Sequence, residues 1–249
     1  MDRTSGDFIA ISDQDDVWCS DKVEKKVASI GNNWCSFHPS PIFETAPNFI
    51  FTDTRKRNCY LEQIIWSNIA LGHTMLINRD FFLLLRKTIP NETLVFRPFF
   101  YDNILSIVSS AYGKLVYLPQ ALSSHRIHNE NASYKKSSRR DCSTRSLSNA
   151  FFLVFRNLSP SSRKKVSPQI LKRFSNVRII LEYFKDAPLI SEFFAFIQKY
   201  INSSNKYICS LYFAIKNRNK IFYATEKNKV VAMLRAFLFP ITIYDQFRK

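Results

Sequence analysis

Short apolar runs separated by polar turns mark the first half of the chain, and two periodicities alternate along it. Compact runs of five or six residues have the length of single strands, whereas apolar residues three or four apart indicate helices. The predicted strands are residues 7–12, 48–52, 73–78, 114–118 and 121–126. The predicted helices are residues 21–30, 80–87 and 103–112. Strands mixed with helices predict an α/β fold.

Two details of this pattern extend the prediction. In the first helix, Val23, Val27 and Ile30 share one face, and Asp21 and Glu24 have the spacing of a capping box. The proline-rich segment 31–47 is predicted to be a loop.

The second half of the chain has a different pattern. Residues 131–147 are polar and basic, which predicts a linker, and aromatic and basic residues then interleave at helical spacing over 148–239. No stretch reaches the roughly 18 uninterrupted apolar residues of a membrane span. We therefore expect a first domain over 1–130, the linker 131–147, and a helical, basic region over 148–249.

Charge separates the same two halves. The formal net charge is +16, yet residues 1–130 hold 13 basic and 14 acidic residues, whereas the remainder holds 23 basic and 6 acidic residues. This asymmetry predicts an anionic partner for the second half, and amphipathic basic helices favour an anionic membrane surface. Nucleic acid is a less favoured alternative, because only charge and aromatic content support it, and a solvated helical appendage is another. The five cysteines form no CxxC pair, which is typical of reduced thiols in the cytosol.

Acidic residues gather where the first predicted strand ends. Asp13, Asp15 and Asp16 follow the run FIAI, and ligands of α/β proteins bind at the carboxyl ends of strands. Asp13-Gln14-Asp15 is a D-x-D arrangement whose carboxylates repel each other unless a cation lies between them. Mg²⁺ or Mn²⁺ bound to oxygen ligands would supply that cation. The alternative is that these aspartates only form a turn or a helix N-cap.

The segment GDFIAISDQDDVWCSDKVEKK resembles the central segment of family 2 glycosyltransferases with the GT-A fold, and is most similar to their rhamnosyltransferase-like branch. Three later segments resemble that branch in the same order, so that the resemblance spans about residues 6–133. They are NIALGHTMLINRD (68–80), FFYDNILSIVSSAYGKLVYL (99–118) and ALSSHRIHNENAS (121–133). The resemblance implies a partial GT-A fold over 1–130.

The resemblance also implies roles for the acidic residues. Asp13 and Asp15 would lie at the metal and the donor diphosphate, with Asp15 as the preferred direct ligand, and Asp16 would face the donor sugar or orient the turn. Trp18 would wall the sugar pocket, or else be a core aromatic residue. Asp102 matches the catalytic base, and it could also cap the helix 103–112.

Roles for the later motifs follow from the same resemblance. His128 aligns with the family histidine and would reach the metal or the diphosphate, or else be structural. Arg126 would pair with phosphate or lie on the surface of its strand. His73 and Thr74 would contact the acceptor. His125 and His128 are three apart, so that on a strand only one of them would face the site.

Two departures from the family pattern qualify these expectations. Family members begin with a strand–helix–strand unit that holds the nucleotide, whereas the acidic motif here starts a dozen residues after Met1. We therefore expect an N-terminally truncated enzyme with weak transfer by residues 1–249. His125 stands where tyrosine is usual, and Ile127 stands where glutamine is usual.

The resemblance implies an inverting hexosyltransferase at the inner face of the cell membrane. It would move a sugar, for which rhamnose is one candidate, from a nucleotide-sugar donor to a glycan or lipid-linked acceptor in surface polysaccharide (O-antigen) synthesis. The alternatives are a non-catalytic remnant and a basic adaptor that binds membrane or nucleic acid.

Overall fold

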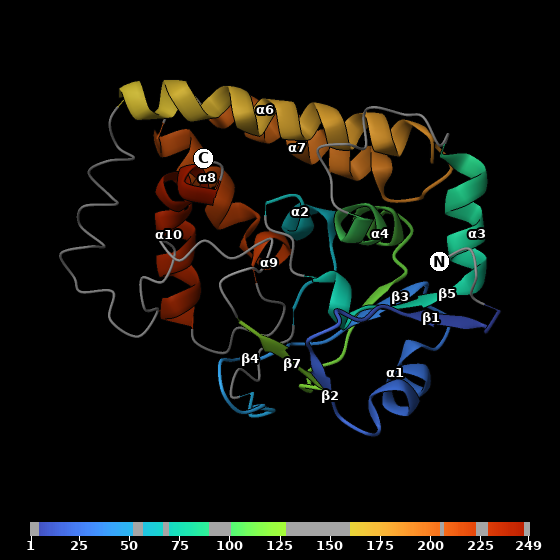
Figure 1. Cartoon of the computed structure of the whole chain (residues 1–249). Coiled ribbons are helices and arrows are strands. Elements are labelled where there is room, and N and C mark those ends of the chain that lie inside the picture. Colours follow the sequence, from blue (N-terminus) through green and yellow to red (C-terminus); the bar gives the residue numbers. More distant parts are fainter. Residues whose placement is uncertain are drawn as a thin grey trace.

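The structure, a computed structural model, describes residues 5–51, 57–66, 70–89, 101–127, 160–204, 207–222 and 229–246. Within these residues the chain is mixed α/β, with nine α-helices and two small sheets (Figure 1). The predicted α/β class is therefore confirmed. The predicted linker, residues 131–147, lies outside the described residues.

A four-stranded sheet forms the centre of the first half. β5 pairs antiparallel with both β1 and β3, and β6 pairs parallel with β3. Helix α1 contacts β3 and β5, whereas α4 contacts β3 and β6 from the other side of the sheet (Figure 1). The strands are, in sheet order, β1 (Phe8–Ala10), β5 (Leu76–Asn78), β3 (Cys35–Phe37) and β6 (Leu115–Tyr117). The helices around it are α1 (Lys22–Ile30), α3 (Arg79–Thr88) and α4 (Tyr101–Ala111).

A smaller sheet lies beside the first one. β7 (Ser123–Arg126) is its central strand, antiparallel to β2 (Val17–Trp18) and parallel to β4 (Ile42–Phe43). Since β1 and β2 belong to different sheets, the acidic segment between them crosses from one sheet to the other. This crossing brings the acidic segment next to the strand that carries His125.

Three predictions in this half are wrong or only partly right. Segment 31–47 is not one loop, because it contains β3 and β4, and residues 48–51 form no strand. Ile50 is exposed, and its N–H donates to the side chain of Asn48 instead of to a neighbouring strand. Segment 73–78 is a strand only over β5, because η1 (Gly72–Thr74) is a 3₁₀ helix. β3 and β4 have three and two residues, too few for a period-two pattern to show.

The face of α1 that packs inward is also different from the predicted one. Val23 and Val27 are exposed at 45% and 38%, whereas Lys22 and Lys26 are each 1% exposed. Both lysines reach backbone carbonyls beneath the helix, so each buried ammonium has hydrogen-bond partners. The Asp21 side chain makes no capping hydrogen bond, so the predicted capping box is not formed.

The second half is helical wherever the structure describes it, as predicted. Its helices share one apolar core with the sheet half, and Trp66 is at the junction: its ring lies edge-on to Phe174, Tyr200 and Phe239 at centroid distances of 5.1, 4.8 and 5.4 Å. Among the described helices, none has the length and apolarity that crossing a bilayer requires. The helices of this half are α6 (Pro160–Glu182), α7 (Ile190–Ser204), α8 (Tyr207–Lys216), α9 (Arg218–Ile221) and α10 (Lys229–Gln246), and α2 (Leu61–Ile64) of the first half contacts α7 and α9.

Arg173 on α6 anchors the helical half to the sheet half. Its Nε donates to the carbonyl of Ile65 at 2.6 Å, and its Nη2 lies 3.4 Å from Oδ1 of Asn103 on α4. Burial lowers the pKa of this guanidinium. The hydrogen bonds therefore lie in a region that water does not readily reach.

We expect Arg173→Met to lower the free energy of unfolding by about 1–2 kcal/mol, because a buried carbonyl loses a charged donor. Urea unfolding followed by tryptophan fluorescence would measure this change. Arg178→Met on the same helix is the control, since Arg178 makes an exposed pair with Glu182 at 3.2 Å and lies 5.7 Å from the centroid of the Phe194 ring. Such pairs contribute under about 1 kcal/mol. Equal effects of the two substitutions would contradict the anchoring role of Arg173.

Candidate functional site

The acidic segment leaves β1 at the carboxyl end of the strand, as predicted. The N–H of Ile11 still bonds to the carbonyl of Met75 at 3.4 Å, beyond which the chain turns through Asp13 and Asp16 into β2. Ser12 Oγ donates to the Asp13 carbonyl at 2.9 Å and holds the start of this turn. The carboxylates are thereby presented at the seam between the two sheets.

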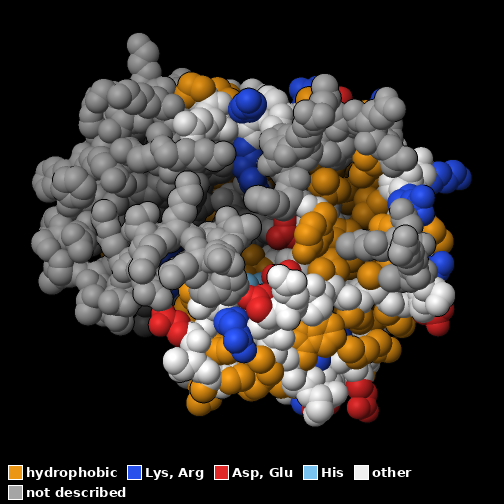
Figure 2. Space-filling view, in the orientation of Figure 1, with side chains coloured by type: hydrophobic (Ala, Val, Ile, Leu, Met, Phe, Trp, Pro, Cys, Tyr) orange, Lys and Arg blue, Asp and Glu red, His pale blue; other side chains and the backbone are white. Residues whose placement is uncertain are grey.

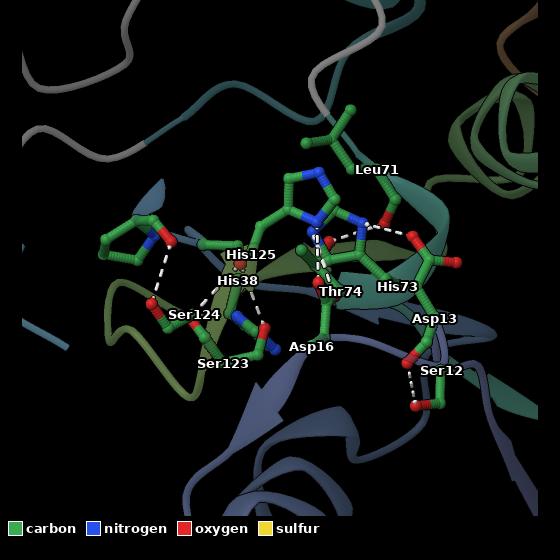
Figure 3. Close-up of polar contacts among 12 residues, drawn as sticks. Ser12, Asp13, Asp16, His38, Leu71, His73, Thr74, Ser123, Ser124 and His125 are labelled. Carbon is green, nitrogen blue, oxygen red and sulfur yellow. Dashed lines mark hydrogen bonds and ion pairs between the residues drawn. The ribbon is translucent and has the colours of Figure 1, made fainter. Parts of the chain in front are cut away.

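Four side chains from three separate segments converge at this seam: Asp13, Asp16, His73 and His125. Their candidate ligand atoms all lie within 4.8 Å of one another, and the carboxylates point toward the imidazole rings (Figure 3). His73 comes from η1 and His125 from β7. The Asp16 side chain is fully buried, whereas that of Asp13 is 45% exposed. The group therefore has a buried side and a side that solvent reaches.

The distances within the group show two tight pairs. Nδ1 of His125 lies 2.6 Å from Oδ1 of Asp16, and Nδ1 of His73 lies 3.5 Å from Oδ2 of Asp13. The two imidazole rings stack with centroids 4.7 Å apart and planes at 13°. Oδ2 of Asp16 and Nε2 of His73 are buried without a hydrogen-bond partner. Such orphaned atoms are uncommon, and a metal ion between them would satisfy both.

The two histidines are shifted in opposite directions. The hydrogen bond to Asp16 raises the pKa of His125, and burial lowers the pKa of His73. Two stacked imidazolium cations would also repel each other. We therefore expect His125 to bind a proton at a higher pH than His73 does.

Lys22 supplies a second positive charge beneath the acidic segment. Its Nζ donates to the carbonyl of His73 at 3.0 Å and lies 3.6 Å from the centroid of the Trp18 ring. Burial lowers the pKa of Lys22 to about 8, although the charges of Asp16 and Asp13 oppose this shift. The positive charge of Lys22 therefore partly compensates the negative charges of Asp13 and Asp16.

Tyr101 links the start of α4 to the acidic segment. Its phenol packs against Gly72 so closely that a Cβ there would overlap the phenol oxygen. Burial raises the pKa of Tyr101, and the negative charges of Asp13 and Asp102 raise it further. The charges of Asp13 and Asp102 therefore both act on the Tyr101 hydroxyl.

Asp102 lies in the first turn of α4, which begins two residues earlier than predicted. Its Oδ1 accepts hydrogen bonds from the backbone N–H of Asn103 at 2.7 Å and from the Asn103 side chain at 3.0 Å. These contacts fix the position of the carboxylate at the helix N-terminus.

The remaining residues predicted to bind the nucleotide-sugar donor are more dispersed. Asp15 lies outside the four-residue group, but its charge contributes to raising the pKa of His125. Trp18 is half-buried, and its indole N–H has no hydrogen-bond partner in the described structure. Arg126 is exposed, with its guanidinium 5.3 Å from the centroid of the Phe43 ring. The roles expected for these three residues stay predictions.

Two other predicted residues have different outcomes. Thr74 is buried, and its hydroxyl donates to the carbonyl of Leu71 at 2.7 Å. Contact between Thr74 and an acceptor stays a prediction. His128, the predicted metal-ligating histidine, lies outside the described residues.

The histidine pair is what sequence reasoning missed. In the sequence His125 is a departure from the family pattern, and His73 is a predicted acceptor contact. Strand alternation implies only that at most one of His125 and His128 faces the site. It could not show that His125 meets Asp16, because the pairing of β7 with β2 depends on tertiary structure.

This part of the surface combines acidic, histidine and apolar side chains. Figure 2 shows red and pale-blue surface near the centre of the face, bordered by apolar side chains. Comparison of the chain with protein-family models, with curated proteins and with solved structures found no match. We therefore infer the function from the residues and their geometry.

Proposed function

We propose that this protein is a metal-dependent glycosyltransferase of the GT-A type, which moves a sugar from a nucleotide-sugar donor to a hydroxyl acceptor with inversion. One observation carries the proposal: carboxylates at the carboxyl end of β1 meet two histidines, and the charges of Asp13 and of Asp102, at the start of α4, both act on Tyr101. A diphosphate-binding metal and a separate base are the two components that this reaction requires.

The donor end of the site is the carboxylate–histidine group. Asp13 and Asp16, with Asp15 beside them, would hold a divalent cation such as Mn²⁺ or Mg²⁺ and orient the donor diphosphate. Such an ion acts as a Lewis acid that offsets charge on the departing nucleoside diphosphate. Asp13 is the half-exposed member of the group, so its carboxylate is the one that a ligand can reach from solvent.

The acceptor end is Asp102 and Tyr101. Asp102 would take the proton from the acceptor hydroxyl as that oxygen attacks the anomeric carbon. The hydrogen bonds from Asn103 hold its carboxylate in a fixed position for this purpose. Tyr101 precedes this base in the chain, and its exposed ring offers a surface for a sugar to pack on.

A screen of nucleotide sugars tests the proposal. Residues 1–249 would be incubated with UDP-, GDP- and dTDP-sugars and an acceptor mixture, and released nucleoside diphosphate would be measured with Mn²⁺ and with EDTA. Metal-dependent release from at least one donor is expected. Release that EDTA leaves unchanged would contradict the proposed role of the metal.

The acceptor's location is the second part of the proposal: we place the protein at the inner face of the cell membrane, against anionic lipid. Five exposed apolar side chains on α10 recur at helical spacing and form one stripe. Lys229 and Arg235 on the same helix add positive charge. An apolar stripe with basic residues is typical of helices that lie on anionic membranes. The stripe consists of Val230, Met233, Leu234, Phe237 and Leu238.

Leu234→Glu is expected to weaken binding to vesicles that contain anionic lipid by about tenfold, because one apolar contact is lost and a repelled charge is added. Co-sedimentation at two salt concentrations would measure the binding. Leu83→Glu on α3 is the control, since Leu83 is also exposed but lies away from the stripe. Binding that is equal for neutral and anionic vesicles would remove the electrostatic part of this proposal.

A further inference from the structure

The donor set of the carboxylate–histidine group contains two imidazoles, which distinguishes it from an all-oxygen site. We propose that Asp13, Asp16, His73 and His125 form a binding site for a first-row transition-metal ion of the Mn²⁺, Co²⁺ or Zn²⁺ class, selected over Mg²⁺. This inference deepens the proposed function and rests on it, because the same carboxylates would orient the donor diphosphate.

The chemistry of the ligands selects the metal class. Mg²⁺ prefers six oxygen ligands and keeps several waters, whereas imidazole nitrogen suits the transition metals. Two nitrogen and two carboxylate donors match mixed-ligand transition-metal sites. The Mg²⁺ alternative, expected when aspartates alone were considered, is therefore the weaker one for this group.

The geometry is close to what such an ion requires. Metal–ligand bonds of about 2.1 Å at tetrahedral angles separate ligand atoms by about 3.4 Å. Nε2 of His73 lies 3.8 Å from Oδ2 of Asp16, whereas the 3.5 Å contact with Asp13 is made by Nδ1 of the same ring. With one ligand atom from each residue, the four candidate ligand atoms lie within 4.8 Å of one another. The His125–Asp16 pair, at 2.6 Å, is a hydrogen bond that would open by under an ångström as the ion replaces the shared proton.

Burial gives an independent indication of a ligand. The Asp16 side chain is 0% exposed and that of His73 is 7% exposed, yet Oδ2 of Asp16 and Nε2 of His73 have no hydrogen-bond partner. Leaving such buried atoms unsatisfied destabilises the folded protein. An ion bound by both residues would satisfy them, so the protein would hold the metal before any nucleotide binds.

The surrounding structure holds the ligands in place without a metal. His73 is in the short helix η1, whose backbone accepts hydrogen bonds from Lys22 and Lys26. His125 is in β7, which is paired on both sides by β2 and β4. A site built on such fixed elements needs little rearrangement when the ion binds.

Cobalt binding to residues 1–249 tests the inference without any activity assay. We expect one bound Co²⁺ with visible absorption bands, displaced by Zn²⁺ or Mn²⁺ and retained in a hundredfold excess of Mg²⁺. X-ray absorption of the wild-type cobalt complex should show imidazole scattering from two histidines, which requires no variant. No Co²⁺ binding, or displacement by equimolar Mg²⁺, would overturn the proposal.

Substitutions then identify the ligands. His73→Asn and His125→Asn are each expected to weaken Co²⁺ binding at least tenfold. His38→Asn is the matched control, because His38 is buried but lies outside the group. Nδ1 of His38 lies 2.9 Å from the Pro39 carbonyl oxygen, and an asparagine side chain can make the same hydrogen bond. If both site variants bind Co²⁺ like the wild type, the assignment is wrong.

The same experiments separate this inference from the proposed function. If Co²⁺ binds tightly but nucleoside diphosphate shows no metal-dependent binding, the metal site is supported and the proposed transferase function is contradicted. If Mg²⁺ supports nucleoside diphosphate binding and neither histidine variant affects it, the proposed transferase function is supported and the transition-metal site is overturned.

Discussion

Replacing Asp102 by asparagine is expected to slow sugar transfer by about 10²–10⁴-fold, the contribution of a positioned general base. Asparagine has the same shape and can still accept the hydrogen bond from the Asn103 N–H, now 2.7 Å from Oδ1, so α4 should keep its start. What is lost is the basic oxygen that takes the acceptor proton. Transfer rates and nucleoside diphosphate affinity, measured in parallel, should therefore separate, with the rate falling and the affinity nearly unchanged.

Asp80→Asn is a matched control for this substitution. Asp80 is the second residue of α3, as Asp102 is the second residue of α4, and it is exposed. Both changes remove one negative charge from the first turn of a helix, where such a charge contributes about 0.3–1 kcal/mol. Only the Asp102 change should affect transfer. If Asp102→Asn transfers sugar at the wild-type rate, this carboxylate only stabilises the start of α4 and is not the catalytic base.

Lys26→Met is expected to lower the free energy of unfolding by about 2–3 kcal/mol. The Lys26 ammonium donates to the carbonyls of Ser36, at 2.9 Å, and Thr74, so it joins β3 to η1 beneath α1. Methionine has a similar length and fills the space, but it leaves both buried carbonyls without this donor. Burial lowers the pKa of Lys26, so the charge itself is costly and offsets part of the loss. Thermal and urea unfolding would measure the change.

The neighbouring lysine provides the control for Lys26. Lys25 pairs with Asp21 at 2.6 Å on the exposed side of α1, one turn along the helix. Lys25→Met should change stability by less than about 0.5 kcal/mol. If Lys26→Met proved as mild as Lys25→Met, the two carbonyls would have to find other partners, and Lys26 would not hold η1 in place.

Elements with a clear period in the sequence were predictable, and the shortest ones were not. The spacing of apolar residues indicated α3 and α4, and compact apolar runs indicated β1, β6 and β7. β3 and β4 are too short to show a period, and pairing with distant strands forms them. The apolar run Asn48-Phe-Ile-Phe has the composition of a strand, but the described fold provides no ladder for it, and Ile50 stays exposed.

The first helix shows why an apolar face can be misassigned. The pattern places Val23 and Val27 inward, because lysine is normally exposed. Ile30 is buried as the pattern places it, but the rest of the observed face is formed by Lys22 and Lys26, which reach carbonyls of η1 and β3. Periodicity alone cannot predict the burial of these lysines, because their burial depends on which backbone carbonyls of distant segments lie beneath the helix.

The candidate site was predictable in part for the same reason. The cluster of aspartates after an apolar run identified the carboxyl end of β1, and Asp102 was identified by resemblance. The meeting of Asp16 with His125, 109 positions apart in the chain, depends on the pairing of β2 with β7. Contacts between distant segments are what a single sequence does not show.

Metal-dependent binding of a nucleoside diphosphate tests the central claim most directly. UDP, GDP and dTDP would each be titrated calorimetrically into residues 1–249 with Mn²⁺ and with EDTA, and UMP would serve as the control that lacks the second phosphate. We predict that at least one diphosphate binds at least tenfold more tightly with Mn²⁺, that UMP shows no such gain, and that Asp13→Asn removes it. If none of the diphosphates binds in the presence of Mn²⁺, or if binding is as tight in EDTA, the carboxylates after β1 do not form a donor site.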